Sequence, residues 1–263
     1  MTLIDTHAHL DHLEQLDQAL EGAVQAGVEG IVTVSVNLAS CRKNLEIKRN
    51  KKTPRICLAM GMHPSDADPG DLDACLDLVR EHKNELSAIG EIGLDFWYKW
   101  VRKDQEKKDL QRRIFRAFLD LAKAVDLPAV IHTRGTWREC FDTVKGMGIA
   151  KAEFHWYSGP LDVLKDILDA GYYISASPGL AYSPPSREAI GYAPIERVMI
   201  ETDSPVFFRT GEPGEDRNGC DGFDAGPKDV FRTLKAYCQL KNIDEARAAE
   251  VFNRNARTFF GLD

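Results

Sequence analysis

Short apolar runs alternate with longer amphipathic segments along the whole chain. Eight runs are short and continuous, and most are rich in β-branched residues: Leu3–Ile4, Ile31–Val36, Ile56–Met60, Ala88–Ile89, Ala129–Ile131, Ala152–Phe154, Tyr172–Ile174 and Val198–Ile200. Such runs are typical of parallel strands that are buried on both faces. Their alternation with helix-length segments indicates an α/β protein.

The segments between the runs carry the hydrophobic period of helices. In the longest of them, apolar residues recur every three or four positions, at Leu110, Ile114, Phe118, Leu121 and Val125. This spacing gives a helix one buried face. Asp104 precedes the segment as a helix N-cap, and Pro128 lies beyond its end. Residues 227–260 predict two more helices, the second capped near Asp244.

The order of these elements predicts one closed barrel. Strands and helices alternate over residues 1–263 without a linker rich in Pro, Gly or Ser. We therefore expect a single domain with the TIM-type (β/α)8 architecture. The same periodicity also fits an open, doubly wound sheet, which is the alternative fold.

Polar residues gather where the predicted strands end. Five of the seven histidines and two acids do so: His7, His9, His63, His132, His155, Glu91 and Asp203. In a barrel, the carboxyl ends of the strands carry the active site. A single histidine at a strand end is more often a core residue, but five of seven at one rim predict a site there.

Three of these motifs have a clear chemical use. His7 and His9 alternate along a strand, so both rings point to one face and can hold one metal ion. Glu91 lies between two glycines, and its two oxygens can bridge two cations. Asp203 can ligate a metal and accept the proton of an attacking water. Glu91 and Asp203 are therefore the candidate catalytic residues. Unrelated histidines at a surface turn and an exposed glutamate are the ordinary alternatives.

Together the strand ends supply a set of nitrogen and oxygen ligands without a thiolate. The expected ligands are His7, His9, Glu91, His132, His155 and Asp203. Such a set suits two divalent metal ions, Mg²⁺, Mn²⁺ or Zn²⁺, and two metals at one site are typical of hydrolases. Asp5 and Glu201 are candidates to orient the imidazoles.

Two further features suggest how a substrate is bound. His63 follows the third run and either contacts a phosphate or carbonyl or has a structural role. Residues 96–100 place aromatic side chains near Arg102 and Lys103. Aromatics interleaved with cations bind single-stranded nucleic acid, although they also cover barrel loops.

Composition limits the partners and the compartment. Charged residues make up 29% of the chain and the formal net charge is −7, whereas proteins that mainly bind duplex DNA are usually basic. The six cysteines form no C-x-x-C pair, which indicates free thiols in a reducing compartment. No signal peptide and no apolar stretch of about 20 residues is evident. We expect a cytoplasmic protein without membrane contact, and by default a monomer.

At this point a family resemblance becomes clear, because it rests on several motifs in register. They are Asp5-Thr6-His7-Ala8-His9, Gly61-Met62-His63-Pro64, Gly90-Glu91-Ile92-Gly93-Leu94-Asp95, Ile131-His132-Thr133-Arg134, Phe154-His155-Trp156-Tyr157-Ser158-Gly159, Glu201-Thr202-Asp203-Ser204-Pro205 and the ending Asn253–Phe260. In this order they resemble the TatD family of metal-dependent deoxyribonucleases over nearly the whole chain.

The resemblance implies a fold and a role for each residue. It implies a TIM-type barrel of the amidohydrolase kind that cleaves DNA phosphodiesters, often as an exonuclease. One metal would be held by His7, His9, Glu91 and Asp203, and the other by Glu91, His132 and His155. The resemblance further implies that Arg134 and His63 face the phosphate of the substrate.

Two departures from the family pattern bear on the substrate. Gly135 stands where the family usually has an acidic residue. Residues 206–226 form a long segment with five acids and only two arginines, which would repel a phosphate backbone near the metals. The leading hypothesis is a deoxyribonuclease acting on single-stranded DNA or strand ends. The alternatives are a hydrolase of amides, lactones or small phosphoesters on the same metals, and a metal-binding protein without activity.

Overall fold

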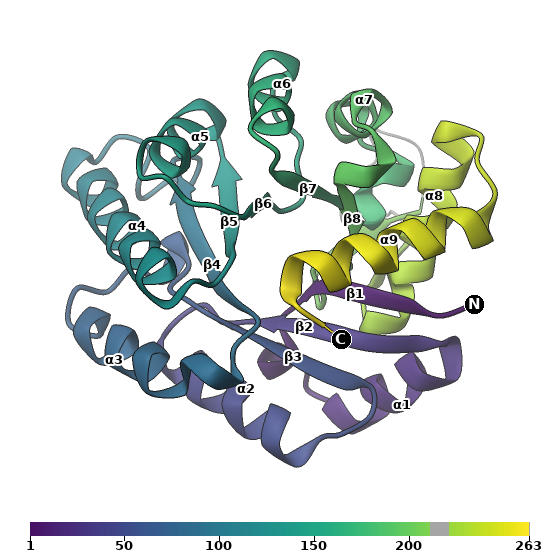
Figure 1. Cartoon of the computed structure of the whole chain (residues 1–263), viewed down its shortest axis with the longest axis horizontal. Helices are drawn as coiled ribbons and strands as arrows, with labels where there is room; N and C mark the ends of the chain where they lie inside the picture. Colours follow the sequence, from purple (N-terminus) through teal and green to yellow (C-terminus); the bar gives the residue numbers. More distant parts are fainter. Residues whose placement is uncertain (211–220, 263) are drawn as a thin grey trace.

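The computed structural model describes residues 1–210 and 221–262. Eight parallel strands pair in sequence order in one sheet (Figure 1). They are β1 (Leu3–Ala8), β2 (Val28–Val34), β3 (Arg55–Met60), β4 (Ala88–Asp95), β5 (Ala129–Arg134), β6 (Ala152–Phe154), β7 (Tyr173–Ala176) and β8 (Val198–Ile200).

The sheet closes on itself between its first and last strands. Ala8 forms a parallel bridge with Ser204, just beyond β8. The Asp203 amide also donates a hydrogen bond to the His7 carbonyl, at 2.9 Å. The (β/α)8 barrel predicted from the sequence is therefore confirmed, and the open sheet is excluded.

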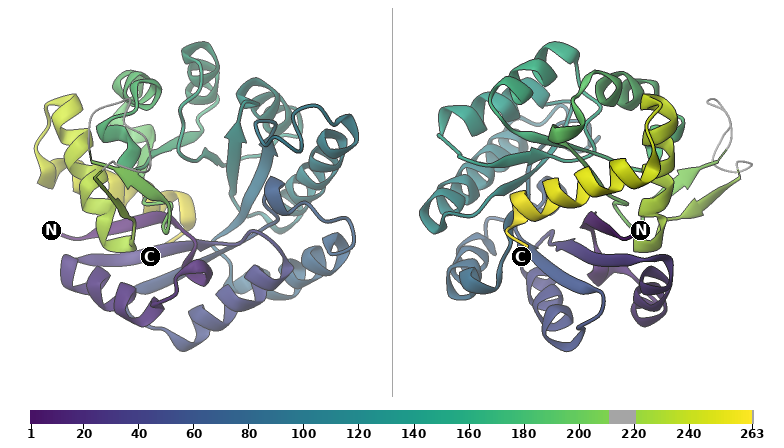
Figure 2. Two further views of the ribbon diagram at one scale, coloured as in Figure 1. Left: turned by 180° about the vertical axis from the view of Figure 1, so that it is seen from behind. Right: turned by 45° about the vertical axis from the view of Figure 1, so that its right-hand side comes forward.

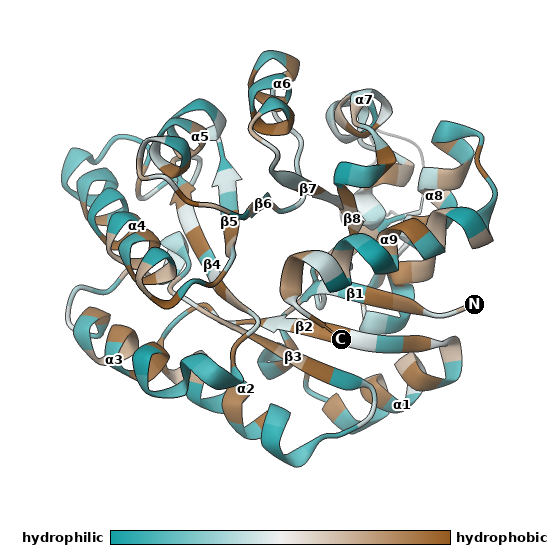
Figure 3. Cartoon of the chain, in the orientation of Figure 1, coloured by the Kyte–Doolittle hydropathy of each residue, from teal (hydrophilic) through white to brown (hydrophobic). Residues whose placement is uncertain are grey.

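Helices follow the strands and cover the outside of the barrel. They are α1 (Leu16–Ala26), α2 (Leu38–Asn50), α3 (Leu72–His82), α4 (Gln105–Val125), α5 (Trp137–Gly146), α6 (Leu161–Asp169), α7 (Pro184–Tyr192), α8 (Val230–Lys241) and α9 (Glu245–Phe260). The predicted caps are present, because the side chains of Asp104 and Asp244 each accept a backbone hydrogen bond at the start of α4 and α9. The outer helices carry both apolar and polar faces (Figure 3).

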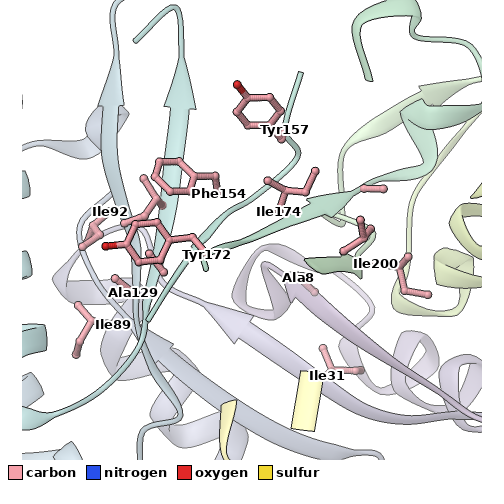
Figure 4. Close-up of a cluster of buried hydrophobic side chains, with 14 of the residues drawn as sticks. Ala8, Ile31, Ile89, Ile92, Ala129, Phe154, Tyr157, Tyr172, Ile174 and Ile200 are labelled. Carbon is pink, nitrogen blue, oxygen red and sulfur yellow. The ribbon is translucent and has the colours of Figure 1, made fainter. Parts of the chain in front are cut away.

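The hydrophobic core has two parts. The larger part lies between the strands and the outer helices, and includes Ile31, Ile89, Ala129, Phe154, Ile174 and Ile200 from six strands (Figure 4). The smaller part groups strand residues such as Val32 and Val130 with Phe259 and Phe260 of α9.

Helix α9 covers the amino-terminal end of the barrel (Figures 1 and 2). The side chain of Asn253 accepts a hydrogen bond from the Ile4 amide and donates one to the Thr2 carbonyl. Asn255 donates to the carbonyls of Ile195 and Val198, next to the start of β8. With that end covered, the carboxyl ends of the strands form the accessible mouth.

Two elements differ from the sequence prediction. Strand β4 continues to Asp95, so Glu91 lies inside the strand rather than after it. All eight residues of β4 are buried and the strand pairs with β5 as far as Arg134, so the backbone stays extended where the pattern becomes polar.

The second difference lies in the segment 206–226. Strands β9 (Phe207–Arg209) and β10 (Gly222–Asp224) form an antiparallel hairpin there, which projects from the barrel (Figure 2). Three of the five acids noted in this segment, Glu212, Glu215 and Asp216, lie outside the described residues, as does Arg217. Within residues 1–210 and 221–262, no helix is both long and apolar enough to cross a membrane.

Candidate metal centre

The six expected metal ligands lie together at the carboxyl ends of the strands. His7, Glu91 and His132 belong to β1, β4 and β5. His9 and His155 directly follow β1 and β6, and Asp203 follows β8. Residues far apart in the sequence thus meet at one rim, as the sequence predicted.

Glu91 is at the middle of this cluster. Its Oε1 lies 2.7 Å from His132 Nδ1 and 2.7 Å from His155 Nε2. Its Oε2 lies 3.2 Å from His7 Nε2 and 3.6 Å from His9 Nε2. The two oxygens of one carboxylate therefore face two separate pairs of imidazoles. This is the arrangement that a bridging ligand requires.

Asp203 completes the group that contains His7 and His9. Its Oδ1 lies 3.2 Å from His9 Nε2 and 3.6 Å from His7 Nε2. The backbone of Asp203 has a left-handed conformation, with φ at 50°. Such a conformation outside glycine persists only where the surroundings hold it, and it is common at functional sites.

Asp5 has a different role from the one expected. It does not orient an imidazole through its side chain; its carboxylate accepts bonds from the Thr202 amide at 3.0 Å and the Thr202 hydroxyl at 2.6 Å. These bonds fix the residue before Asp203. Glu201 lies beside an imidazole, with its Oε1 3.5 Å from His155 Nδ1, but neither atom has a hydrogen-bond partner among the described residues. Its Oε2 accepts a bond from the Ser175 hydroxyl at 2.7 Å.

Asp95 is a site residue that the sequence analysis did not single out. This buried carboxylate lies 3.1 Å from His132 Nε2 and accepts a bond from Arg134 Nε at 2.8 Å. Its other oxygen accepts a bond from the Trp97 amide at 2.9 Å. One signal was available: Asp95 is four residues from Glu91, so on an extended strand both side chains point to the same face.

The close approach of β4 and β5 depends on a glycine. Gly93 pairs with His132 in the register of the two strands and has φ at 155°. A Cβ at this position would lie 1.9 Å from the His132 carbonyl oxygen. Glycine is therefore required between the two acids of β4, which explains part of the Gly-Glu-Ile-Gly-Leu-Asp motif.

The donors of the cluster fit divalent cations. Both ring nitrogens of His7 and Nδ1 of His9 are buried without a hydrogen-bond partner among the described residues. A buried polar atom without a partner is costly, so such atoms call for a ligand. Four groups of the described residues bring ligand atoms within 4.8 Å of one another. They are His7 with His9 and Asp203, His63 with Glu91 and His132, His7 with His155 and Glu201, and His9 with Asp11 and His12.

The charges of the cluster are set by burial and by one another. Burial alone raises the pKa of Glu91, but the imidazoles of His155, His63 and His7 lower it well below its ordinary value. Burial lowers the pKa of His63 to about 3, so this imidazole is neutral at physiological pH. The site therefore offers an ionised carboxylate beside a neutral ring.

A cavity of about 770 Å³ opens above the cluster. Both residues that the sequence assigned to the substrate, His63 and Arg134, line it. His63 Nδ1 is 2.6 Å from the Ser65 hydroxyl, and its Nε2 is 3.6 Å from Glu91. The Arg134 guanidinium lies 4.7 Å from the centre of the Tyr98 ring.

The acidic segment contributes little to the described part of this cavity. From 206–210 and 221–226, only Val206 lines it. The side chains of Asp221 and Asp224 belong to exposed residues and are not among the lining groups. The described part of the segment 206–226 therefore places no acidic side chain in the cavity wall that would repel a phosphate.

Residues 4–261 match the family model described as TatD related DNase. The chain belongs to the TatD family. A metal-dependent hydrolase of Methanocaldococcus jannaschii is 30% identical over 98% of this chain and 96% of its own length. The human deoxyribonuclease TATDN3 is 27% identical over 98% of this chain and 94% of its own.

Solved structures agree on the fold of the TatD family. The TatD homologue YjjV of Escherichia coli matches with a TM-score of 0.84 at 24% identity, over 99% of this chain and 98% of its own. A TatD family hydrolase of Entamoeba histolytica matches with a TM-score of 0.83 at 23% identity, over 99% and 98%. This chain is therefore a TatD family metal-dependent hydrolase with a (β/α)8 barrel.

Replacing Asp95 by asparagine is expected to weaken metal binding to this TatD protein about 10- to 100-fold. If the amide oxygen keeps the bond from the Trp97 amide, its NH₂ group faces His132 and Arg134, which also donate. His132 then loses the partner that sets its orientation. Titration calorimetry with Mn²⁺ measures the loss. The matched control is Asp126→Asn, an exposed helix cap in the left-handed conformation that asparagine tolerates. Equal affinities in both variants would show that Asp95 does not act on the site.

Proposed function

We propose that this TatD hydrolase cleaves DNA phosphodiester bonds from a strand end, with two divalent cations. His7, His9 and Asp203 with one Glu91 oxygen would hold the first cation. His132 and His155 with the other Glu91 oxygen would hold the second. Divalent cations at such a site activate water for attack and neutralise the charge that develops on the phosphate.

The residues of the chain have separate tasks in this reaction. Asp203 accepts the proton of the attacking water, since its carboxylate lines the cavity and its Oδ1 lies beside the two imidazoles of the first group. Arg134 binds the phosphate of the substrate from the cavity wall, held there by Asp95. His63, neutral and fixed by Ser65, offers a further polar contact.

The observation that carries the proposal is the division of Glu91 between two imidazole pairs below a cavity with a guanidinium in its wall. The first feature suits two metals, and the second suits an anionic substrate. The deoxyribonuclease name of the human relative, which is 27% identical, agrees with this chemistry.

The test is a nuclease assay on end-labelled DNA with Mg²⁺ or Mn²⁺, and with EDTA as the control. Single-stranded oligonucleotides are expected to shorten one nucleotide at a time, and a circular single strand is expected to stay intact. Cleavage of the circle would refute the requirement for an end. If no form of DNA is cut while small esters or amides are hydrolysed, the DNA substrate is refuted and the other hydrolase hypothesis takes its place.

A further inference from the structure

Trp97 exposes a large apolar surface at the mouth of the cavity. Its exposed fraction is 57%, and it lines the cavity together with Arg134 and Tyr98. The other exposed large apolar residues of the described chain, Trp100 among them, are not in the cavity wall. Its place in the cavity wall puts this indole within reach of a bound substrate.

The indole is held in a fixed position. Its backbone amide donates to Asp95 at 2.9 Å. Its ring lies edge-to-face with Trp137, with centroids 5.7 Å apart and planes at 88°. On Gly135, an added Cβ would lie 2.3 Å from two atoms of the indole. Any side chain at position 135 would therefore displace Trp97.

This contact requires a residue without a side chain at position 135. Glycine leaves the space that the indole occupies, and its φ of 73° also favours glycine. Gly135 and the exposed Trp97 are thus parts of one local arrangement, which presents an aromatic surface at the cavity.

Arg134 shares the cavity wall with Trp97, and its guanidinium lies over the Tyr98 ring. Asp95 binds Arg134 Nε through one oxygen and the Trp97 amide through the other. The same buried carboxylate also contacts His132, so the indole, the guanidinium and the metal cluster share one anchor. An aromatic ring and a guanidinium that are held by one carboxylate in the same cavity wall match the base and the phosphate of one nucleotide.

We infer that Trp97 stacks on the nucleobase adjoining the scissile phosphate, while Arg134 binds that phosphate. The inference rests on the proposed function and adds the residue that holds the terminal base. A base inside a duplex is already stacked and paired, so it reaches Trp97 only after fraying. Single-stranded ends are therefore cleaved in preference to blunt duplex ends.

The decisive test compares normal and abasic strand ends. Oligonucleotides carry an abasic nucleotide at the 5′ end, at the 3′ end or at neither. Trp97→Ala is expected to raise KM at least about tenfold on the unmodified strand. On the strand whose cleaved end lacks the base, the same substitution is expected to change KM by less than about threefold. Trp97→Phe keeps an aromatic face and should retain most of the wild-type KM.

The matched control is Tyr192→Ala, which removes an exposed aromatic residue at the end of α7, outside the cavity wall. It should leave KM within about twofold of wild type. Equal losses for Trp97→Ala on normal and abasic ends would show a structural role and overturn the inference. No loss on either strand would also overturn it.

A binding measurement separates this inference from the proposed function. 2-Aminopurine at the strand end is quenched when it stacks on an aromatic ring, and the signal needs no hydrolysis. If the wild type quenches the signal, Trp97→Ala does not, and no DNA is cut, the nuclease activity is refuted and the stacking role of Trp97 is supported. If DNA is cut and the two proteins quench equally, the nuclease activity is supported and the stacking role of Trp97 is refuted.

Discussion

Glu91→Gln is expected to lower kcat for metal-dependent hydrolysis at least about a thousandfold, which corresponds to about 4 kcal/mol of transition-state stabilisation. Glutamine has the shape of glutamate but only one oxygen. It can face one pair of imidazoles but not both, whereas the two oxygens of Glu91 lie 2.7 Å from His132 and 3.2 Å from His7. The loss of charge also removes the only carboxylate shared by both groups.

Two measurements follow this change in parallel. Elemental analysis of the purified proteins should find two metal ions per chain in the wild type and at most one in Glu91→Gln. Steady-state kinetics on single-stranded DNA should show the loss in kcat. The matched control is Glu106→Gln, which changes an exposed glutamate in the first turn of α4. A Glu91→Gln protein with both metals and near-normal kcat would rule out the bridging role.

The fold could be predicted because apolar runs dominate the barrel strands. Each of the eight runs corresponds to one of the strands β1 to β8, in order. The predicted bounds of the strands were less accurate near the site residues. β4 was expected to end at Ile89 but continues to Asp95, because Gly90 and Glu91 interrupt the apolar run. The hairpin of β9 and β10 was missed because each of its strands has only three residues.

The convergence of the candidate ligands could be predicted because barrel geometry alone brings strand ends together. His7, Glu91 and His132 needed no further information than their position after, or near the end of, an apolar run. Residues that act on the ligands were harder to find. Asp95 and Asp5 were both in the quoted motifs, but which side chain each carboxylate contacts depends on strand register, and that is a property of the assembled sheet.

Trp97 is a further residue whose contacts could not be predicted from the sequence. Its loop was noted for aromatics beside cations, and Gly135 was noted as a departure from the family. Only the folded chain shows that the two residues touch, since they lie in the loops after β4 and β5. Contacts between loops depend on the strands that carry them, so sequence analysis can name both residues without connecting them.

Asp203→Asn is expected to lower kcat about a thousandfold while leaving the fold intact. Asparagine accepts the left-handed backbone that Asp203 adopts, with φ at 50°, as readily as aspartate does. The bonds that hold the turn, from the Asp203 amide to His7 and from Thr202 to Asp5, do not involve the Asp203 side chain. The substitution therefore removes the negative charge and the ability to accept a proton, and little else.

Activity measured at increasing Mn²⁺ concentration separates the two proposed roles of Asp203, metal ligand and proton acceptor. If the carboxylate serves only as a ligand, saturating Mn²⁺ should restore kcat in the Asp203→Asn protein. If it also accepts the proton of the attacking water, kcat should stay low when both metals are bound, and we expect this result. Asp224→Asn, an exposed change on β10, serves as the control and should stay within about twofold of wild type. Full recovery of kcat in Asp203→Asn at high Mn²⁺ would show that another group accepts the proton.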